Sequence, residues 1–128
     1  MPKEQKFYLC KRCGNLVGLV DNAGVPMTCC GEEMTELKPN TVDAAHEKHL
    51  PVVKVAGGEV SVEIGSVAHP MLPEHHIAWV YAQTEQGGQR KNLNVAGEPK
   101  VRFAMTGGDR AVAVFAYCNL HGLWKMDC

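Results

Sequence analysis

The sequence predicts a mainly β protein in two parts: a small metal-binding unit stapled by four cysteines, followed by an antiparallel β-sandwich of immunoglobulin type. Four of the six cysteines lie within the first 30 residues. From residue 51 onward, short stretches with alternating apolar and polar side chains recur, separated by turns that contain glycine. Such evenly spaced short strands are typical of an antiparallel sandwich. We place the boundary at residues 1–37 and 38–128.

The composition is that of an ordinary globular protein. The chain has 128 residues, 45% of them hydrophobic and 21% charged, which allows a small stapled unit and one modest core. A net charge of −1 without a basic run argues against nucleic acid as a partner. No apolar stretch reaches the roughly 18 to 20 residues that a membrane span needs, and we expect no membrane association.

The start of the chain indicates the compartment. Met1 to Lys6 is polar and leads into no apolar signal core, so we expect a cytoplasmic protein. Thiols stay reduced in the cytosol. Six cysteines in such a protein indicate metal binding rather than disulfide bonds.

The first unit has the cysteine spacing of a tetrahedral four-thiolate site. A short strand over Phe7–Leu9 leads into Cys10-x-x-Cys13, a second strand is expected over Asn15–Val20, and Cys29-Cys30 closes the unit. Zinc and iron both use such a site, and the spacing does not decide between them. Neighbouring side chains of an extended backbone point apart. Cys29 and Cys30 can therefore share a metal only if the backbone kinks, which predicts a distorted tetrahedron.

The second part is expected to contain seven strands after a linker. One helical turn is expected over Thr41–Lys48, with Thr41 as its cap. Gly57-Gly58 joins the first two strands as a hairpin, and further turns are expected at Gly87-Gly88, Gly97 and Gly107-Gly108. The expected strands are Val53–Val55, Val60–Ile64, Ile77–Ala82, Lys91–Val95, Val101–Met105, Ala111–Tyr117 and Leu123–Met126.

The loops of the second part carry a second candidate metal site. Cys118 and His121 lie three residues apart, His49 precedes the first strand, and His69 and His75 share a loop that two prolines stiffen. Zinc usually stops at four ligands, whereas four neutral imidazoles and one thiolate fit a square-pyramidal iron with an open sixth position. An open position opposite an electron-rich thiolate suits redox chemistry.

The remaining histidines and the last cysteine are expected to have no role in this site. Adjacent side chains of an extended segment face opposite ways, so only one of His75 and His76 should bind a metal. We assign His46 and His76 to the surface, and Cys128 to a frayed terminus.

The motifs of both parts closely resemble those of the desulfoferrodoxins, the two-iron form of superoxide reductase. The resemblance covers essentially the whole chain, and its Glu-Lys-His and C-terminal motifs are the most specific. It rests on Cys10-x-x-Cys13, Cys29-Cys30, Glu47-Lys48-His49-x-Pro51, Ala68-His69-Pro70-Met71, the region of Glu74 to His76, and Cys118-Asn119-Leu120-His121-Gly122-x-Trp124-Lys125.

The resemblance implies two iron ions with separate ligand sets. The first domain would resemble desulforedoxin and hold ferric iron through its four cysteines. The second would hold the catalytic ferrous iron, which reduces superoxide by one electron to hydrogen peroxide. The implied ligands are Cys10, Cys13, Cys29 and Cys30 for the first iron, and equatorial His49, His69, His75 and His121 with axial Cys118 for the second.

Two charged residues next to His49 have roles in this interpretation. The resemblance implies that Glu47 occupies the sixth position of the ferric form. Lys48 would add positive charge at the mouth of the site and could position a water that donates a proton. A rubredoxin is the electron donor that the resemblance suggests. A small stapled unit would also gain from pairing across a two-fold axis, and we expect a homodimer.

Two alternatives remain open at this point. The chain could be a non-catalytic electron carrier or zinc-ribbon scaffold in which the histidines are incidental. It could also be a superoxide dismutase. Metal analysis distinguishes the first alternative from the enzyme, since two irons per chain favour the enzyme and one zinc favours the scaffold. Oxygen evolution from superoxide without a reductant would indicate the second alternative.

Overall fold

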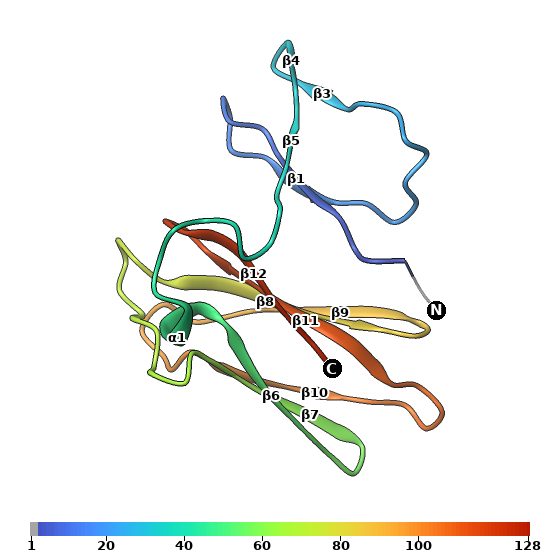
Figure 1. Cartoon of the computed structure of the whole chain (residues 1–128), viewed down its shortest axis with the longest axis vertical. Helices are drawn as coiled ribbons and strands as arrows, with labels where there is room; N and C mark the ends of the chain where they lie inside the picture. Colours follow the sequence, from blue (N-terminus) through green and yellow to red (C-terminus); the bar gives the residue numbers. More distant parts are fainter. Residues whose placement is uncertain (1–2) are drawn as a thin grey trace. The chain divides into compact units, whose positions relative to one another are not determined.

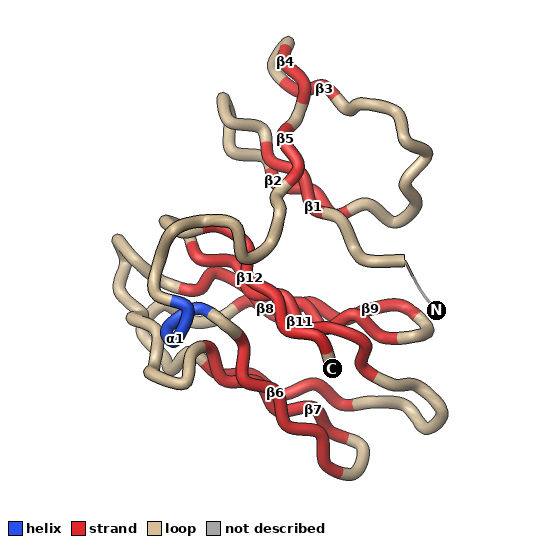
Figure 2. Tube along the Cα trace, in the orientation of Figure 1, coloured by secondary structure: helices blue, strands red, loops and turns tan. Residues whose placement is uncertain are grey.

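The computed structural model describes residues 3–128, and the chain divides into two compact units, Met1–Lys38 and Pro39–Cys128 (Figure 1). Strands make up nearly all of the regular structure in both units, as Figure 2 shows. Within the described residues, no helix is long and apolar enough to cross a membrane. The assignment of residues 1–37 and 38–128 to two separate iron domains stays a prediction.

The first unit is a small three-stranded antiparallel sheet with a hairpin. The sheet has the order β2-β1-β5, and β3 pairs with β4. Its strands are β1 Phe7–Leu9, β2 Leu16–Gly18, β3 Thr28–Cys29, β4 Glu32–Glu33 and β5 Thr35–Glu36. Only Phe7, Cys10 and Met34 are buried among its described residues. A core of three side chains is too small to fold such a unit, so a metal staple is needed.

The second unit is the expected antiparallel sandwich of seven strands. One sheet has the order β10-β7-β6 and the other the order β12-β11-β8-β9. The strands are β6 Pro51–Ala56, β7 Glu59–Ile64, β8 Ile77–Thr84, β9 Gly87–Asn92, β10 Lys100–Ala104, β11 Ala111–Cys118 and β12 Gly122–Asp127. The turns at Gly57-Gly58 and Gly107-Gly108 lie where the sequence placed them.

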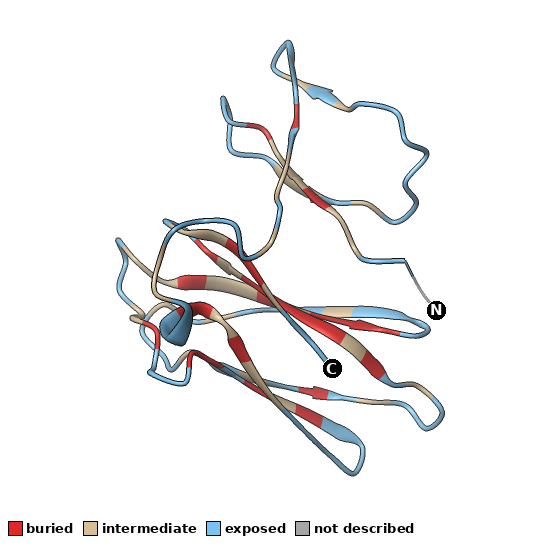
Figure 3. Cartoon of the chain, in the orientation of Figure 1, coloured by how far each residue is buried: buried red, intermediate tan, exposed pale blue. Residues whose placement is uncertain are grey.

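Side chains of facing strands form the core between the two sheets. Figure 3 marks the buried residues along these strands in red. On β11 the inward row is Val114, Ala116 and Cys118, each with no exposed surface. Cys118 is thus the last core residue of its strand, at the point where β11 turns into β12. Because side chains alternate along β11, the Cys118 thiol points inward at the end of the sandwich.

The helical turn differs from the sequence prediction. It is α1, His46–His49, and Ala45 precedes it without a side-chain cap, so the expected helix over Thr41–Lys48 with Thr41 as cap is wrong. Asn40 explains the late start: its backbone N–H donates to the Leu123 carbonyl at 3.0 Å, which ties this segment to β12. Its left-handed φ of 62° also breaks the backbone just before Thr41.

The position of β9 is the second difference. Gly87 and Gly88 do not form the turn but pair with Thr84 and Gln83, so β9 starts four residues before the expected Lys91–Val95 and ends at Asn92, three residues before its expected end. A Cβ at Gly88 would lie 1.9 Å from the Tyr81 hydroxyl oxygen. Gly88 is therefore needed inside the strand because the ring of Tyr81 crosses over it.

Candidate metal centres

The four cysteines of the first unit gather in one place, which we call the four-cysteine cluster (Cys10, Cys13, Cys29 and Cys30). Their sulfur atoms all lie within 4.8 Å of one another. The Cys13 and Cys29 sulfurs are 3.6 Å apart, and those of Cys29 and Cys30 are 4.0 Å apart. Four sulfurs at such spacing surround a space that one tetrahedral metal ion can fill.

A tight turn brings the two adjacent cysteines to the same side. Cys30 and Gly31 connect β3 to β4 with φ angles of 54° and 75°. Two successive left-handed residues are typical of a hairpin turn whose twist matches its strands. The backbone therefore kinks at Cys29-Cys30 as the sequence predicted, because an extended backbone would have separated the two sulfurs.

Electrostatics of the four-cysteine cluster favour a bound cation. The backbone N–H of Cys13 points at the Cys10 sulfur and lowers the pKa of that thiol to about 6. The contact with Cys13 raises the pKa of Cys30 to about 12, so the last proton leaves with difficulty. Four thiolates repel one another unless a positive ion lies between them.

Four histidines and Cys118 gather at one end of the sandwich in the histidine–cysteine cluster (His49, His69, His75, Cys118 and His121). One donor atom each from His49, His75, Cys118 and His121 lies within 4.8 Å of the other three. The Nε2 atom of His69 lies 3.2 Å from His49 Nε2 and 3.4 Å from the Cys118 sulfur. The structure thus brings together all five side chains that the sequence selected.

Hydrogen bonds orient the imidazoles so that lone pairs face the centre of this cluster. Nδ1 of His49 lies 2.7 Å from the Ala45 carbonyl, and Nδ1 of His69 lies 2.7 Å from the Pro70 carbonyl. A carbonyl only accepts, so each Nδ1 carries the proton and each Nε2 is left as a bare acceptor. Outer hydrogen bonds of this kind are usual for histidines that bind a metal.

His75 carries the clearest sign of a metal-binding donor atom. Its Nε2 is buried and has no hydrogen-bond partner. Native proteins rarely leave a buried polar atom unpaired, so such an atom requires an explanation. His121 differs from the other histidines, because it presents Nδ1 to the cluster, 3.1 Å from His49 Nε2 and 3.9 Å from the Cys118 sulfur. A metal ion would satisfy all of these atoms together.

Burial favours the neutral form of His49, His69 and His75, which is the form that binds metal. It lowers the pKa of His69 to about 4, while the hydrogen bond to Pro70 opposes this shift. Burial also lowers the pKa values of His49 and His75, and the neighbouring imidazoles add to both shifts. Burial raises the pKa of the Cys118 thiol, while the backbone amides of Leu120 and His121 lower it. A bound cation would complete the stabilisation of that thiolate.

Trp124 packs against the histidine–cysteine cluster from the core of the sandwich. Its ring stacks on His49, with centroids 4.8 Å apart and planes at 26°. Its Nε1 donates to the His121 carbonyl at 3.1 Å. The side chain has no exposed surface, so these contacts are held by the core. The sequence motif contained Trp124, but nothing in its spacing revealed this role.

The turn that carries Glu47, Lys48 and His49 is fastened to the loop that follows β7. The backbone N–H of Val67 donates to the Glu47 carbonyl at 3.0 Å. Gly65 allows the close approach, since a Cβ there would lie 2.7 Å from the Lys48 carbonyl oxygen and its φ is 88°. The loop beyond Val67 leads to His69, so this contact fixes two of the donor side chains relative to each other.

Glu47 and Lys48 lie on the exposed side of α1. The Glu47 carboxylate is not among the donor atoms gathered in either cluster of the described chain. The charge of Lys48 is felt at the site. Burial and His121 lower the pKa of His75, and the positive charge of Lys48 lowers it further. The charge of Lys48 is therefore felt at His75, whereas the Glu47 carboxylate does not lie among the gathered donor atoms.

The chain was then compared with known proteins. The family model of desulfoferrodoxin matches residues 41–127, and the desulfoferrodoxin homolog of Archaeoglobus fulgidus is 40% identical over 98% of both chains. The chain belongs to the desulfoferrodoxin family. The crystal structure of the superoxide reductase from Treponema pallidum is also similar. It has 46% identity and a TM-score of 0.83, and the match covers 98% of this chain and all of that one.

A shorter relative matches only part of this desulfoferrodoxin. The superoxide reductase of Pyrococcus horikoshii is 36% identical, over 63% of this chain and 85% of its own. The four-cysteine and histidine–cysteine clusters correspond to the two iron centres of a desulfoferrodoxin. Five donors, one of them a thiolate, suit iron better than zinc, which usually takes four. That each named side chain binds its iron stays a prediction.

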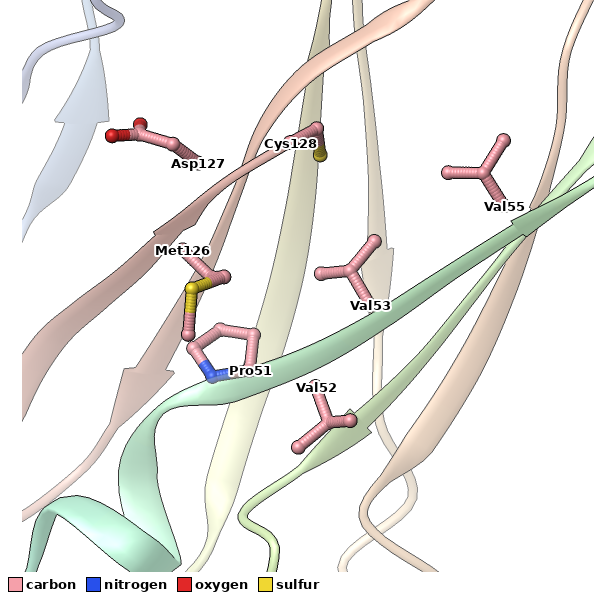
Figure 4. Close-up of a pocket in the computed structure, with 7 residues that line it drawn as sticks. All are labelled: Pro51, Val52, Val53, Val55, Met126, Asp127 and Cys128. Atoms are coloured by element: carbon pink, nitrogen blue, oxygen red, sulfur yellow. The ribbon is translucent and has the colours of Figure 1, made fainter.

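One pocket of the second unit lies at the sandwich edges (Figure 4). It has a volume of about 460 Å³ and opens between the edge strands β6 and β12. Its lining is mainly apolar: Pro51, Val52, Val53, Val55, Met126, Asp127 and Cys128. Cys128 is not frayed as expected, because its backbone N–H donates to the Val112 carbonyl at 2.9 Å. The pocket contains none of the predicted site residues.

Proposed function

We propose that this desulfoferrodoxin is a superoxide reductase whose reaction takes place at the histidine–cysteine cluster. The unpaired, buried Nε2 of His75 amid four further donor atoms is the observation that carries the proposal. The names of the relatives described above support the same reaction. Superoxide would take up one electron and two protons to give hydrogen peroxide, and no oxygen would be released.

The proposed ligands of the catalytic iron are His49, His69, His75 and His121 with Cys118, and those of the other iron are the four cysteines. Iron bound at the histidine–cysteine cluster would supply the single electron. Burial favours the neutral form of His49 and His69, and neutral imidazoles would leave the site with a net positive charge once the metal is bound. That charge favours an anionic substrate.

Lys48 is proposed to attract superoxide and to hold a water that donates a proton. Its side chain is exposed on α1, and its charge is felt at His75. A cation at the mouth of a site raises the encounter rate with an anion, and this effect weakens as salt is added. The two protons that peroxide formation needs would come from solvent by way of such a water.

Glu47 is proposed to join the residues that hold the oxidised iron. It is exposed and two residues from His49, so a small movement of α1 would bring its carboxylate toward the metal. A carboxylate is a good ligand for the more highly charged ferric ion. Glu47→Ala should therefore change the visible spectrum of the ferric form and leave that of the ferrous form unaltered.

The four-cysteine centre is proposed to be dispensable for the chemistry. The Pyrococcus horikoshii relative, which matches 63% of this chain, is itself named a superoxide reductase. Two of the four cysteines, Cys13 and Cys30, are exposed, which suits electron entry from a small carrier such as a rubredoxin. We further propose a homodimer and a cytoplasmic location, which gel filtration and cell fractionation would test.

Product counting tests the proposed reaction. The iron-loaded protein with an excess of reductant should yield one hydrogen peroxide for each superoxide consumed, with no oxygen. A superoxide dismutase would release oxygen without any reductant. A non-catalytic electron carrier or zinc scaffold would leave superoxide to its spontaneous decay, and metal analysis would then find fewer than two irons per chain.

A further inference from the structure

Asn119 holds together two loops that carry different donor side chains. Its Oδ1 accepts a hydrogen bond from the His76 backbone N–H at 2.8 Å, and its Nδ2 donates to the Glu74 carbonyl at 3.1 Å. Its own backbone N–H donates to the His76 carbonyl at 3.1 Å. One residue thus contacts the backbone on both sides of His75.

The position of Asn119 in the chain makes these contacts significant. It follows Cys118 directly and lies two residues before His121, so it belongs to the turn between β11 and β12. Near this point the register of β11 against β8 shifts by one residue between Tyr117 and Cys118. The regular ladder is interrupted there, and the Asn119 side chain continues the pairing by replacing a backbone carbonyl.

The His75 loop has little other support of its own. Leu72, Pro73 and Glu74 are exposed, and the loop is closed internally by a pair of hydrogen bonds between the backbones of Leu72 and His75. These bonds shape the loop but do not tie it to the turn with Cys118. The strand pairing of Ile77 with Cys118 begins only two residues after His75. The Asn119 side chain, which contacts the backbone of Glu74 and His76, therefore fastens the part of the loop that carries His75 itself.

We propose that Asn119 is a positioning residue that sets the place of His75 relative to Cys118 and His121. This inference rests on the proposed function only in that these side chains bind a metal. Residues that orient metal ligands typically change metal affinity by about 10- to 100-fold when they are replaced. Loss of the Asn119 amide should free His75 first and leave the remaining donors in place.

Asn40 offers a matched control in the same unit. Its Oδ1 accepts from the Lys125 backbone N–H at 2.9 Å, and its Nδ2 donates to the Lys125 carbonyl at 3.1 Å. Both asparagines are exposed, and each side chain makes one accepted and one donated bond to the backbone. Asn40 has a left-handed φ of 62°, so glycine is the replacement that adds no strain.

The experiment compares Asn119→Ala with Asn40→Gly in the iron-loaded full chain. Iron is drawn from the histidine–cysteine centre by a ferrous chelator, and the visible band of that centre is followed separately from the four-cysteine band. Asn119→Ala should release this iron about 10- to 100-fold faster than the native protein. Asn40→Gly should match the native protein. Equal release rates for the two variants would overturn the proposal.

Hydrogen exchange provides a second readout that does not depend on activity. The peptide containing the His76 amide should exchange faster in Asn119→Ala and keep its protection in Asn40→Gly. Asn119→Asp keeps the acceptor for that amide, so it should recover the protection even if the alanine variant folds poorly. Unchanged exchange in Asn119→Ala would contradict the proposed contact. Neither measurement uses superoxide. The role of Asn119 can therefore be tested even if the protein does not reduce superoxide.

Discussion

The two metal centres of this desulfoferrodoxin depend on their surroundings in opposite ways. In the first unit, Cys13 and Cys30 are exposed and only three described side chains are buried. In the second unit, His49 and His69 are each 2% exposed and Cys118 is fully buried within a sandwich core. We therefore expect the first site to supply most of the stability of its unit, whereas the second site lies on a fold that has a hydrophobic core of its own.

The two clusters differ in the number of donor atoms, and this difference distinguishes a structural metal site from a reactive one. Four sulfurs complete a tetrahedron and leave no position for a substrate. The histidine–cysteine cluster offers five donors, which leaves iron one open position. A reactive site needs both an open position and a rigid support, and in the second unit Trp124 and Gly65 contribute to that support.

The largest expected effect is at Cys118. Changes outside the ligand shell typically cost about 10- to 100-fold, so Cys118→Ser should lower the second-order rate with superoxide by more than about 100-fold. The four-cysteine band should persist, since that centre is in the other unit. Stopped-flow mixing and the visible spectrum check both. A variant that reacted at the native rate would remove the thiolate from the reaction.

The reciprocal change should affect the first unit alone. Cys13→Ser removes one of four sulfurs, and with so small a core residues 3–38 should lose their fold, which limited proteolysis would detect. Superoxide reduction with an artificial reductant should continue at the native rate. If the rate fell as far as it does for Cys118→Ser, the two centres would not be separable as proposed.

The metal-free second unit should lose stability in acid. The folded pKa of His69 is about 4, below its ordinary value of 6.5 because of burial, so the unfolded chain binds more protons between these values. The contribution of His69 to the free energy of unfolding should be complete above pH 6.5, fall toward pH 4, and then level off. The lowered pKa values of His49 and His75 act in the same direction. Urea titrations across this range would contradict the account if stability stayed constant.

Lys48→Ile should produce a smaller effect that depends on salt. Removing the charge should slow the reaction with superoxide several-fold at low ionic strength, because an exposed cation steers anions over about 10 Å at 0.1 M salt. The native and variant rates should converge as salt is added. Rates that differ by the same factor at all salt concentrations would assign Lys48 to proton supply rather than to steering.

The smallest effect is expected at Trp124. Trp124→Phe keeps an aromatic ring against His49 but removes the Nε1 hydrogen bond to the His121 carbonyl. The loss of one hydrogen bond should lower the free energy of unfolding by about 1 to 2 kcal/mol, with a minor change in rate. Thermal melts of the iron-loaded protein measure this. A complete loss of iron would mean that the bond does more than orient His121.

Much of this arrangement could be predicted from the sequence, because metal ligands and strand alternation are local signals. The spacing of Cys10, Cys13, Cys29 and Cys30 indicated one cluster, and adjacent cysteines required the kink that Cys30 makes. The alternation of β11 leads directly to an inward Cys118. Each of these inferences needs only the neighbouring residues in the chain.

The parts that could not be predicted depend on contacts between distant segments. Gly88 looked like a turn residue, but the ring of Tyr81 on the neighbouring strand decides its place. The helical turn started late because Asn40 is tied to β12. The bonds from Asn119 to Glu74 and His76 join residues more than 40 positions apart, and no local pattern reveals them.

Rapid mixing of the fully reduced, iron-loaded protein with superoxide tests the central claim most directly. The account predicts that the band of the oxidised histidine–cysteine centre appears first, at a rate proportional to superoxide concentration, while the four-cysteine centre stays reduced. One hydrogen peroxide should form for each centre oxidised. Oxidation of the four-cysteine centre first, or formation of peroxide without any change at the histidine–cysteine centre, would contradict the account.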